Sequence, residues 1–404
     1  MRYYASVIAS GGFDYPELFR HLKNLPPIAI MPTGRSGSDY LQSLLEGHPN
    51  ILTFNGHFLW HEQFYGVARS VLLEVQSPVD VVNEFVGLFL YKLVSKYDVQ
   101  EGKHQLGENR NESIQINLDE FRSHVLGLIK DQPLNSRNWL LSIYGAYSLC
   151  LQRDLTKTKV FLHHPHLETE LRLFAEDFPE TKVLFTVRDT RASLFSQIDN
   201  FRRFYPDTHD SESHLYESLR MNLRGSYMVQ DLGLETVSIR LEDLPREDVL
   251  RGLCSWMNIT WDSSLLSSTW GGLEWHGDSL SKRTPKKNWS QNRTHNDWEK
   301  KLTRRDQLLV RACTSARLVH FGYEKQELKK FVSLLTLFVA LFPMSLELRY
   351  LSPRYIAKSF NLGKIGIIQI LESPLFYFKR VKLCLKYILP TFKELKPTLN
   401  WIKI

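Results

Sequence analysis

The stretch PTGRSGSDY (residues 32–40) combines two glycines, an arginine and serine hydroxyls between an apolar run and a helical pattern. Backbone N–H groups at a helix N-terminus have no partner within the helix and attract anions. Arg35, Ser36, Gly37 and Ser38 are therefore a candidate phosphate-binding loop. It is not a Walker loop, because no lysine follows its second glycine. An ordinary turn between a strand and a helix is the alternative interpretation.

Arg188 and Ser196 form a second candidate anion site. Arg188 follows the apolar run TKVLFTV (181–187), and Ser196 lies two turns into the helical pattern that comes next. A guanidinium group pairs bidentately with phosphate oxygens, and a serine on the adjoining helix can add a hydrogen bond. Two such sites on neighbouring strand ends indicate a ligand that carries phosphate at both ends.

The elements that must position these residues are buried strands alternating with helices. Strands are predicted by the apolar runs at 28–31, 159–163, 181–187 and 236–244. This alternation predicts an α/β fold with a P-loop-like parallel sheet flanked by helices, in which ligands bind at the carboxyl ends of the strands.

Two further regions complete the predicted organisation. Helical patterns at 67–75, 81–94, 118–129 and 138–151 predict a helical insertion over about 66–155, interrupted by a polar loop at 101–117. We place a basic, amphipathic helical region at 327–404 after an α/β domain at 1–326.

The charge of the chain lies mainly in this C-terminal region. Lys and Arg number 51 against 44 Asp and Glu, a net charge of +7, and residues 325–404 hold 14 of the basic and 4 of the acidic residues. Residues 1–324 thus carry 37 basic against 40 acidic residues, which predicts no nucleic-acid partner. No metal is implied, because no ligand cluster has metal-site spacing.

The two candidate anion sites carry a resemblance to a known family. MPTGRSGSDYLQSLLEGHPNI (31–51) and FPETKVLFTVRDTRASLFSQ (178–197) resemble sulfotransferases that use 3′-phosphoadenosine-5′-phosphosulfate (PAPS), in particular the carbohydrate and tyrosylprotein branch. The segments 239–266 and 296–324 are similar to later parts of that family, so the resemblance covers about 28–324. It implies that Arg35, Ser36, Gly37 and Ser38 hold the 5′-phosphosulfate.

The same resemblance implies that Arg188 and Ser196 hold the 3′-phosphate. One position departs from the family pattern: Asp39 stands where a second hydroxyl residue is usual. A carboxylate close to a phosphate is repelled by it, so we expect Asp39 to turn away, towards a backbone cap or the acceptor.

Sulfuryl transfer needs a cation at the oxygen that leaves and a base at the acceptor hydroxyl. We assign the first role to Arg35. The resemblance places the base, a Glu or His, soon after the first helix, where His57 is the first candidate, Glu62 the second and His61 a rival. His163 and His164 are expected either to contact acceptor or sulfate or to cap the following helix.

Two basic segments allow two interpretations each. Residues 282–298 are either a solvated loop or a loop that closes over the 3′-phosphate with Lys282, Arg283 and Arg293. The C-terminal region contains the uncharged run 331–346, which is just under the length of roughly 17–25 residues that spans a bilayer and contains Pro343. It is either an interfacial membrane anchor or a packed helical unit with a solvated basic face.

The sequence therefore predicts a sulfotransferase that moves the sulfuryl group from PAPS to an acceptor hydroxyl, on a saccharide or glycolipid. The N-terminus lacks a pattern typical of a signal peptide, so we expect a cytoplasmic protein, peripheral on the cytoplasmic face of a membrane. The alternatives are a nucleoside-phosphate kinase and a membrane-associated nucleotide-binding protein with a degenerate site.

Overall fold

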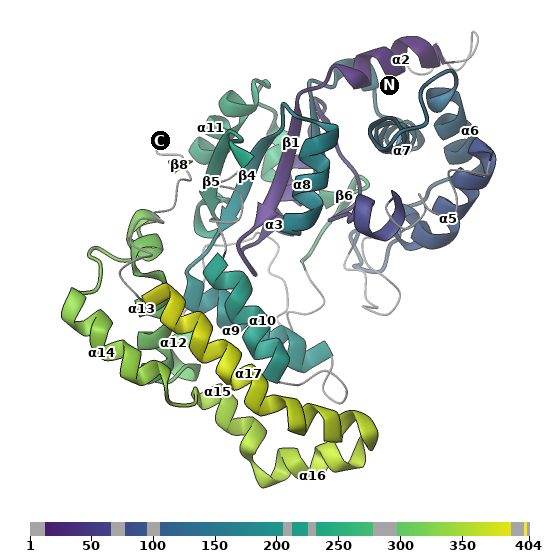
Figure 1. Ribbon diagram of the computed structural model, residues 1–404. Coiled ribbons are helices and arrows are strands. Elements are labelled where there is room, and N and C mark those ends of the chain that lie inside the picture. The colour runs from purple at the N-terminus through teal and green to yellow at the C-terminus, as the bar shows by residue number, and fades with distance from the viewer. Residues whose placement is uncertain are drawn as a thin grey trace.

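A computed structural model of the protein describes residues 13–65, 77–94, 106–204, 212–224, 232–277, 297–388 and 400–401. A six-stranded parallel sheet with the order β2-β3-β1-β4-β5-β8 forms its centre (Figure 1). The strands are β1 (Pro27–Pro32), β2 (Ile51–Leu52), β3 (Val160–His163), β4 (Lys182–Val187), β5 (Thr236–Arg240) and β8 (Asn400–Trp401). The parallel sheet with its flanking helices confirms the predicted fold class.

Strand β1 lies in the middle of the sheet, and all six of its residues are buried. An apolar run without polar interruption requires helices on both faces of the sheet, as observed. β1 pairs with β3 on one side and with β4 on the other, where Pro32 is opposite Thr186. The strand order therefore reverses at β1, and ligands of such sheets bind at the carboxyl ends of the strands beside this reversal.

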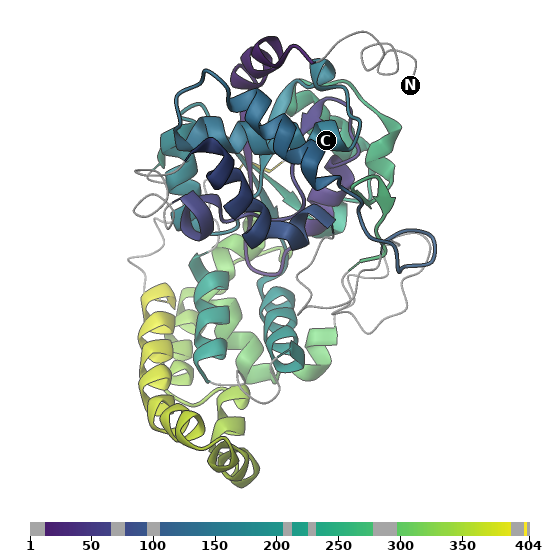
Figure 2. The ribbon, with the colours of Figure 1, turned by 90° about the vertical axis from the view of Figure 1, so that its right-hand side faces the viewer.

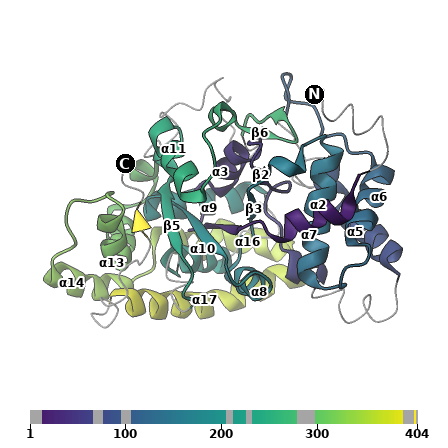
Figure 3. The same ribbon diagram turned by 90° about the horizontal axis from the view of Figure 1, so that it is seen from above.

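The helices that surround the sheet agree with the predicted alternation. They are α2 (Tyr15–Lys23), α3 (Ser38–Leu45), α5 (Pro78–Val94), α6 (Leu118–Ile129), α7 (Ser136–Cys150), α8 (Glu168–Asp177), α9 (Thr190–Phe204), α10 (Glu212–Arg224) and α11 (Glu247–Met257). Seen from above, α5, α6 and α7 gather at one end of the sheet (Figure 3). The predicted helices at 81–94, 118–129 and 138–151 are confirmed, and the one predicted at 67–75 lies outside the described residues.

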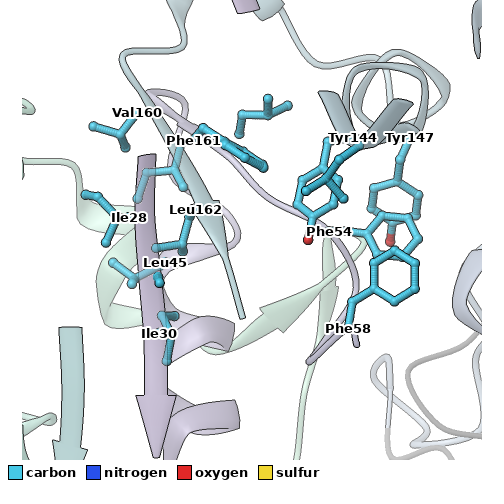
Figure 4. Close-up of a cluster of buried hydrophobic side chains, with 14 of the residues drawn as sticks. Ile28, Ile30, Leu45, Phe54, Phe58, Tyr144, Tyr147, Val160, Phe161 and Leu162 are labelled. Atoms are coloured by element: carbon cyan, nitrogen blue, oxygen red, sulfur yellow. The ribbon is translucent and has the colours of Figure 1, made fainter. Parts of the chain in front are cut away.

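Aromatic side chains fix the segment that follows β2 against α7. The Phe54 ring lies 5.2 Å from that of Tyr144 and 4.8 Å from that of Tyr147, measured between ring centroids. Figure 4 shows these side chains beside Phe58 and the buried side chains of β1 and β3. Burial of several large rings holds the 53–58 segment in place, and this segment carries His57.

Strand β5 is shorter than the predicted run 236–244. It ends at Arg240, and Leu241–Asp243 form a turn of 3-10 helix. The Arg240 guanidinium donates to the Asp243 carboxylate at 2.7 Å, which closes the turn. A two-stranded antiparallel hairpin of β6 (Thr269–Trp270) and β7 (Leu273–Glu274) follows later in the chain.

The C-terminal helices form a layer below the sheet (Figure 2). They are α12 (Asp297–Lys301), α13 (Arg304–His320), α14 (Lys330–Ala340), α15 (Ser345–Leu348), α16 (Pro353–Asn361) and α17 (Lys364–Ile388). One hydrophobic cluster joins this layer to α9 and α10, through residues such as Leu194, Leu219, Met344 and Cys384. The predicted boundary between residues 326 and 327 stays a prediction.

Candidate functional site

The loop between β1 and α3 is shaped by two glycines with positive φ. Gly34 has a φ of +83° and Gly37, the N-cap of α3, a φ of +88°. The buried Ser36 hydroxyl accepts from the Thr33 N–H at 3.0 Å and lies 2.8 Å from the Thr186 hydroxyl of β4. The Ser36 side chain therefore braces the loop against β4, and its predicted contact with a ligand stays a prediction.

Replacing Gly37 with alanine tests this loop shape. A Cβ at Gly37 would lie 2.4 Å from Leu241 Cδ1, and the positive φ is unfavourable for any L side chain. We expect Gly37→Ala to lower the free energy of unfolding by about 1–3 kcal/mol, measured by urea denaturation. Gly87→Ala in α5 is the control, because no atom outside the local backbone of its own helix lies within 4 Å of its Cβ position. Equal stability of the two variants would contradict the argument.

Arg188 follows β4 and reaches the loop. Its Nη1 donates to the main-chain oxygen of Arg35 at 3.5 Å, so the structure brings the two predicted anion sites together. Burial lowers the pKa of Arg188, and the positive charge of Arg35 acts in the same direction, whereas Glu242 and Tyr323 oppose both. The Tyr323 hydroxyl donates to the Glu242 carboxylate at 2.7 Å. Glu242 and Tyr323 are thus close enough to act on the charge of Arg188.

Three buried polar atoms near this loop have no hydrogen-bond partner among the described residues: Arg188 Nε, Ser193 Oγ and Asn222 Oδ1. A Cβ at Gly34 would lie 2.7 Å from Ser193 Oγ and 2.9 Å from Asn222 Oδ1, so α9 and α10 meet the loop here. Buried donors and acceptors are ordinarily paired, so these three atoms are available to a polar ligand or an ordered water. Ser196 lies one turn further along α9 and is half-buried.

Ser193 and Asn222 were not among the predicted site residues. Ser193 lies only three residues before Ser196, on the same helix, and this spacing is the signal that could have identified it. Asn222 is on α10, and no sequence pattern connects that helix with the glycine loop. Arg35 is half-buried, and Ser38 is buried in the first turn of α3.

Three histidine rings gather beside the first turn of α3. The centroid of the His57 ring lies 4.7 Å from that of His166 and 5.9 Å from that of His164. His164 Nδ1 lies 2.9 Å from Gln42 Oε1 and 3.9 Å from the Asp39 carboxylate. Asp39 therefore turns towards these histidines.

Burial keeps His57 neutral. It lowers the pKa of His57 well below 6.5; His166 and Lys92 lower the pKa further, and Asp39 opposes them. The buried Lys92 ammonium donates to the main-chain oxygen of His57 at 2.5 Å, which fixes the backbone at this point. A neutral imidazole is the protonation state that can accept a proton from a hydroxyl.

Glu62 and His61, the other two candidate bases, do not belong to this histidine cluster. Glu62 is exposed on a turn of π-helix, His61–Tyr65, and accepts a hydrogen bond from the Thr169 hydroxyl of α8. The structure thus does not bring it to the histidine cluster. His61 is buried, and although burial alone would lower its pKa, hydrogen bonds to Asp177 and Glu170 raise it to about 9. A protonated His61 holds α8 in place.

His163 lies in the core rather than at the site. It is fully buried at the end of β3, where its Nδ1 is 2.7 Å from the Tyr144 hydroxyl and its ring stacks on Phe174 with centroids 4.6 Å apart. The neighbouring His164 is the first residue after β3, and its ring faces Gln42 and Asp39 of α3 instead. Lys282, Arg283 and Arg293 lie outside the described residues.

Fold and site together define an α/β protein with a basic, glycine-containing loop at the switch point of a parallel sheet. Residues 26–263 match the sulfotransferase family, so the chain belongs to that family. The protein is a sulfotransferase, an enzyme that transfers a sulfuryl group to an acceptor. The resemblance found in the sequence is thereby confirmed at the level of the family.

Solved sulfotransferase structures are similar to this chain. The sulfotransferase domain of the Synechococcus PCC 7002 olefin synthase is 18% identical, with a TM-score of 0.39, and the match covers 68% of this chain and 88% of that one. The sulfotransferase domain from the curacin biosynthetic pathway is 16% identical, with a TM-score of 0.38, and the match covers 60% of this chain and 78% of that one. The sulfotransferase STF9 from Mycobacterium avium is 12% identical, with a TM-score of 0.34, and the match covers 63% of this chain and 68% of that one. None of the curated proteins matches the sequence significantly.

Proposed function

We propose that this sulfotransferase uses PAPS as its sulfuryl donor. The observation that carries the proposal is the meeting of the glycine loop with Arg188 at the carboxyl ends of the adjacent strands β1 and β4. The unpartnered Arg188 Nε and Ser193 Oγ, together with the close approach of Ser193 to the Gly34 backbone, fit a phosphate-bearing ligand. A kinase reading is disfavoured, because Ser38 stands where a Walker lysine would follow the second glycine.

In this proposal Arg35, Ser36, Gly37 and Ser38 hold the 5′-phosphosulfate, and Arg188 and Ser196 hold the 3′-phosphate. Bound PAPS supplies an activated sulfuryl group for transfer. Arg35 stabilises the negative charge that develops as the group is transferred, and neutral His57 accepts the proton of the attacking hydroxyl. Asp39 stabilises the imidazolium that results, since its charge already raises the pKa of His57.

The acceptor that we propose is a hydroxyl on a saccharide or glycolipid, as in the carbohydrate branch of the family. Two features support it: the base is a histidine suited to an alcohol, and the C-terminal helices that pack on α10 expose apolar side chains suited to a lipid-linked molecule. Transfer of labelled sulfate from PAPS to a panel of saccharides, glycolipids, small alcohols and tyrosine peptides tests this choice. Transfer to tyrosine alone would contradict it.

A thermal shift experiment tests the donor. Adenosine 3′,5′-bisphosphate at about 100 times its Kd should stabilise the protein by about 2.7 kcal/mol, which raises Tm by about 3 °C. We expect Arg188→Ala to weaken this binding by about 10²-fold, because it removes a half-buried positive charge from the phosphate site.

Arg122→Ala is the matched control, since Arg122 lies on α6 and bonds to Asn83 and Asp119. It should respond to the ligand as the wild type does. A Tm that rises with ATP and Mg²⁺ but not with adenosine 3′,5′-bisphosphate would favour a kinase. Binding without transfer to any acceptor would favour a binding protein with a degenerate site.

A further inference from the structure

The C-terminal helices expose an unusual amount of apolar surface. Fourteen of the twenty large hydrophobic side chains that are exposed among the described residues lie between 334 and 378. On α17 they form a stripe at helical spacing, Ile368, Leu371, Leu375 and Phe378, of which Leu371 is 72% and Phe378 66% exposed. We call this stripe, with the exposed Phe360 at the end of α16, the apolar stripe.

The charges around the apolar stripe are almost all positive. Between 353 and 388 the exposed charged residues are six basic ones and Glu372. The basic residues are Arg354, Lys358, Lys364, Lys379, Lys382 and Lys386. Arg380 and Glu347 form a buried ion pair, at 2.8 Å, and neutralise each other. The surface therefore combines exposed apolar side chains with a balance of +5.

We propose that the apolar stripe and its basic rim bind the surface of a membrane that contains anionic phospholipids. Apolar side chains enter the boundary between headgroups and acyl chains, while lysines contact the phosphates. A second copy of this chain fits less well, because a symmetric contact would bring the same positive rim against itself. Figures 1 and 2 show the corner of α16 and α17 at the end of the molecule furthest from the sheet, where it can reach a flat surface.

The structure favours a helix layer that lies on the membrane rather than one that crosses it. One window of the described residues, Leu334–Leu351, is apolar enough to span, with a mean hydropathy of 1.5 over 18 residues. However, α14 ends at Ala340 and is 11 residues long, about 16 Å, against the roughly 30 Å of a bilayer core. Arg380 also donates to the main-chain oxygens of Ala340 and Phe342, which ties the bend after α14 to α17.

Flotation with lipid vesicles tests the proposal on the full chain. The wild type should float with vesicles of about one third phosphatidylserine in phosphatidylcholine and not with phosphatidylcholine alone. We expect the double variant Leu371→Glu, Phe378→Glu to lose at least about tenfold in partitioning. Leu266→Glu is the matched control, because Leu266 is 53% exposed on a turn remote in sequence from the stripe. It should bind as the wild type does.

A second variant tests the basic rim. Replacing Lys379, Lys382 and Lys386 with glutamine should lower binding to the acidic vesicles by about tenfold and weaken its dependence on salt. Wild-type protein that does not bind these vesicles, or equal binding by all variants, would overturn the proposal. So would a lipid-free dimer, seen by sedimentation velocity, that the double variant converts to a monomer. An unchanged thermal shift with adenosine 3′,5′-bisphosphate shows that the variants are folded, and it separates this proposal from the proposed donor.

Discussion

Replacing Arg35 with alanine is expected to lower kcat by about 10²–10³-fold, the usual effect of losing one preorganised donor at a site of developing charge. Arg35 lies within the loop between β1 and α3, and its side chain is half-buried. Its main-chain oxygen accepts from Arg188, so the backbone at this position stays anchored whatever side chain it carries. The substitution should therefore remove the guanidinium without changing the shape of the loop.

The measurement is transfer of labelled sulfate from PAPS to the acceptor that the panel identifies. Arg35→Lys keeps the charge but loses the planar group of donors, and should fall between the wild type and Arg35→Ala. Arg122→Ala should leave the rate unchanged. Because the effect is on the transition state, binding of adenosine 3′,5′-bisphosphate should weaken much less than kcat falls. A rate for Arg35→Ala within threefold of the wild type would remove Arg35 from its proposed role.

The sequence is sufficient to predict the sheet and one face of the site. Uninterrupted apolar runs occur where a strand is buried on both faces, and β1, β3 and β4 are such strands. The residue that follows a buried strand then lies at the ligand-binding edge, which is why Arg188 could be placed beside the glycine loop. Short strands cannot be predicted in this way, because β2 and β8 have two residues each, too few to show a hydrophobic pattern.

The other face of the site depends on contacts between segments that are distant in sequence. Asn222 meets Gly34 only because α10 packs below the sheet, and no local pattern encodes that packing. Glu62 is five residues from His57, yet the π-helical turn directs it to Thr169 of α8. His163 and His164 are adjacent, yet His163 at the end of β3 packs on Phe174, whereas His164 just after the strand lies at the cluster. The positions of the candidate bases relative to the glycine loop therefore could not be predicted from the sequence.

His57→Ala is expected to lower kcat by about 10²–10⁴-fold, the range typical for loss of a general base. The site has to keep this imidazole neutral, and burial does so by lowering its pKa well below 6.5, with His166 and Lys92 acting in the same direction. Activity should then be constant from pH 6.5 upward until another group of the site changes its protonation state. It should fall only as the pH drops through the lowered pKa, where His57 takes up a proton and can no longer accept one.

The pH profile of kcat/KM distinguishes this role from a structural one. The wild type should show an acid limb below pH 6.5, and His57→Ala should lose that limb together with the rate. His320→Ala, on the exposed side of α13, is the control, and it should keep both the acid limb and the wild-type rate. Since His57 is half-buried beside two other histidines, His57→Gln is included to preserve packing, and its thermal shift with adenosine 3′,5′-bisphosphate should match the wild type. An acid limb that persists in His57→Gln would assign the base to another residue of the cluster, with His166 the next to replace.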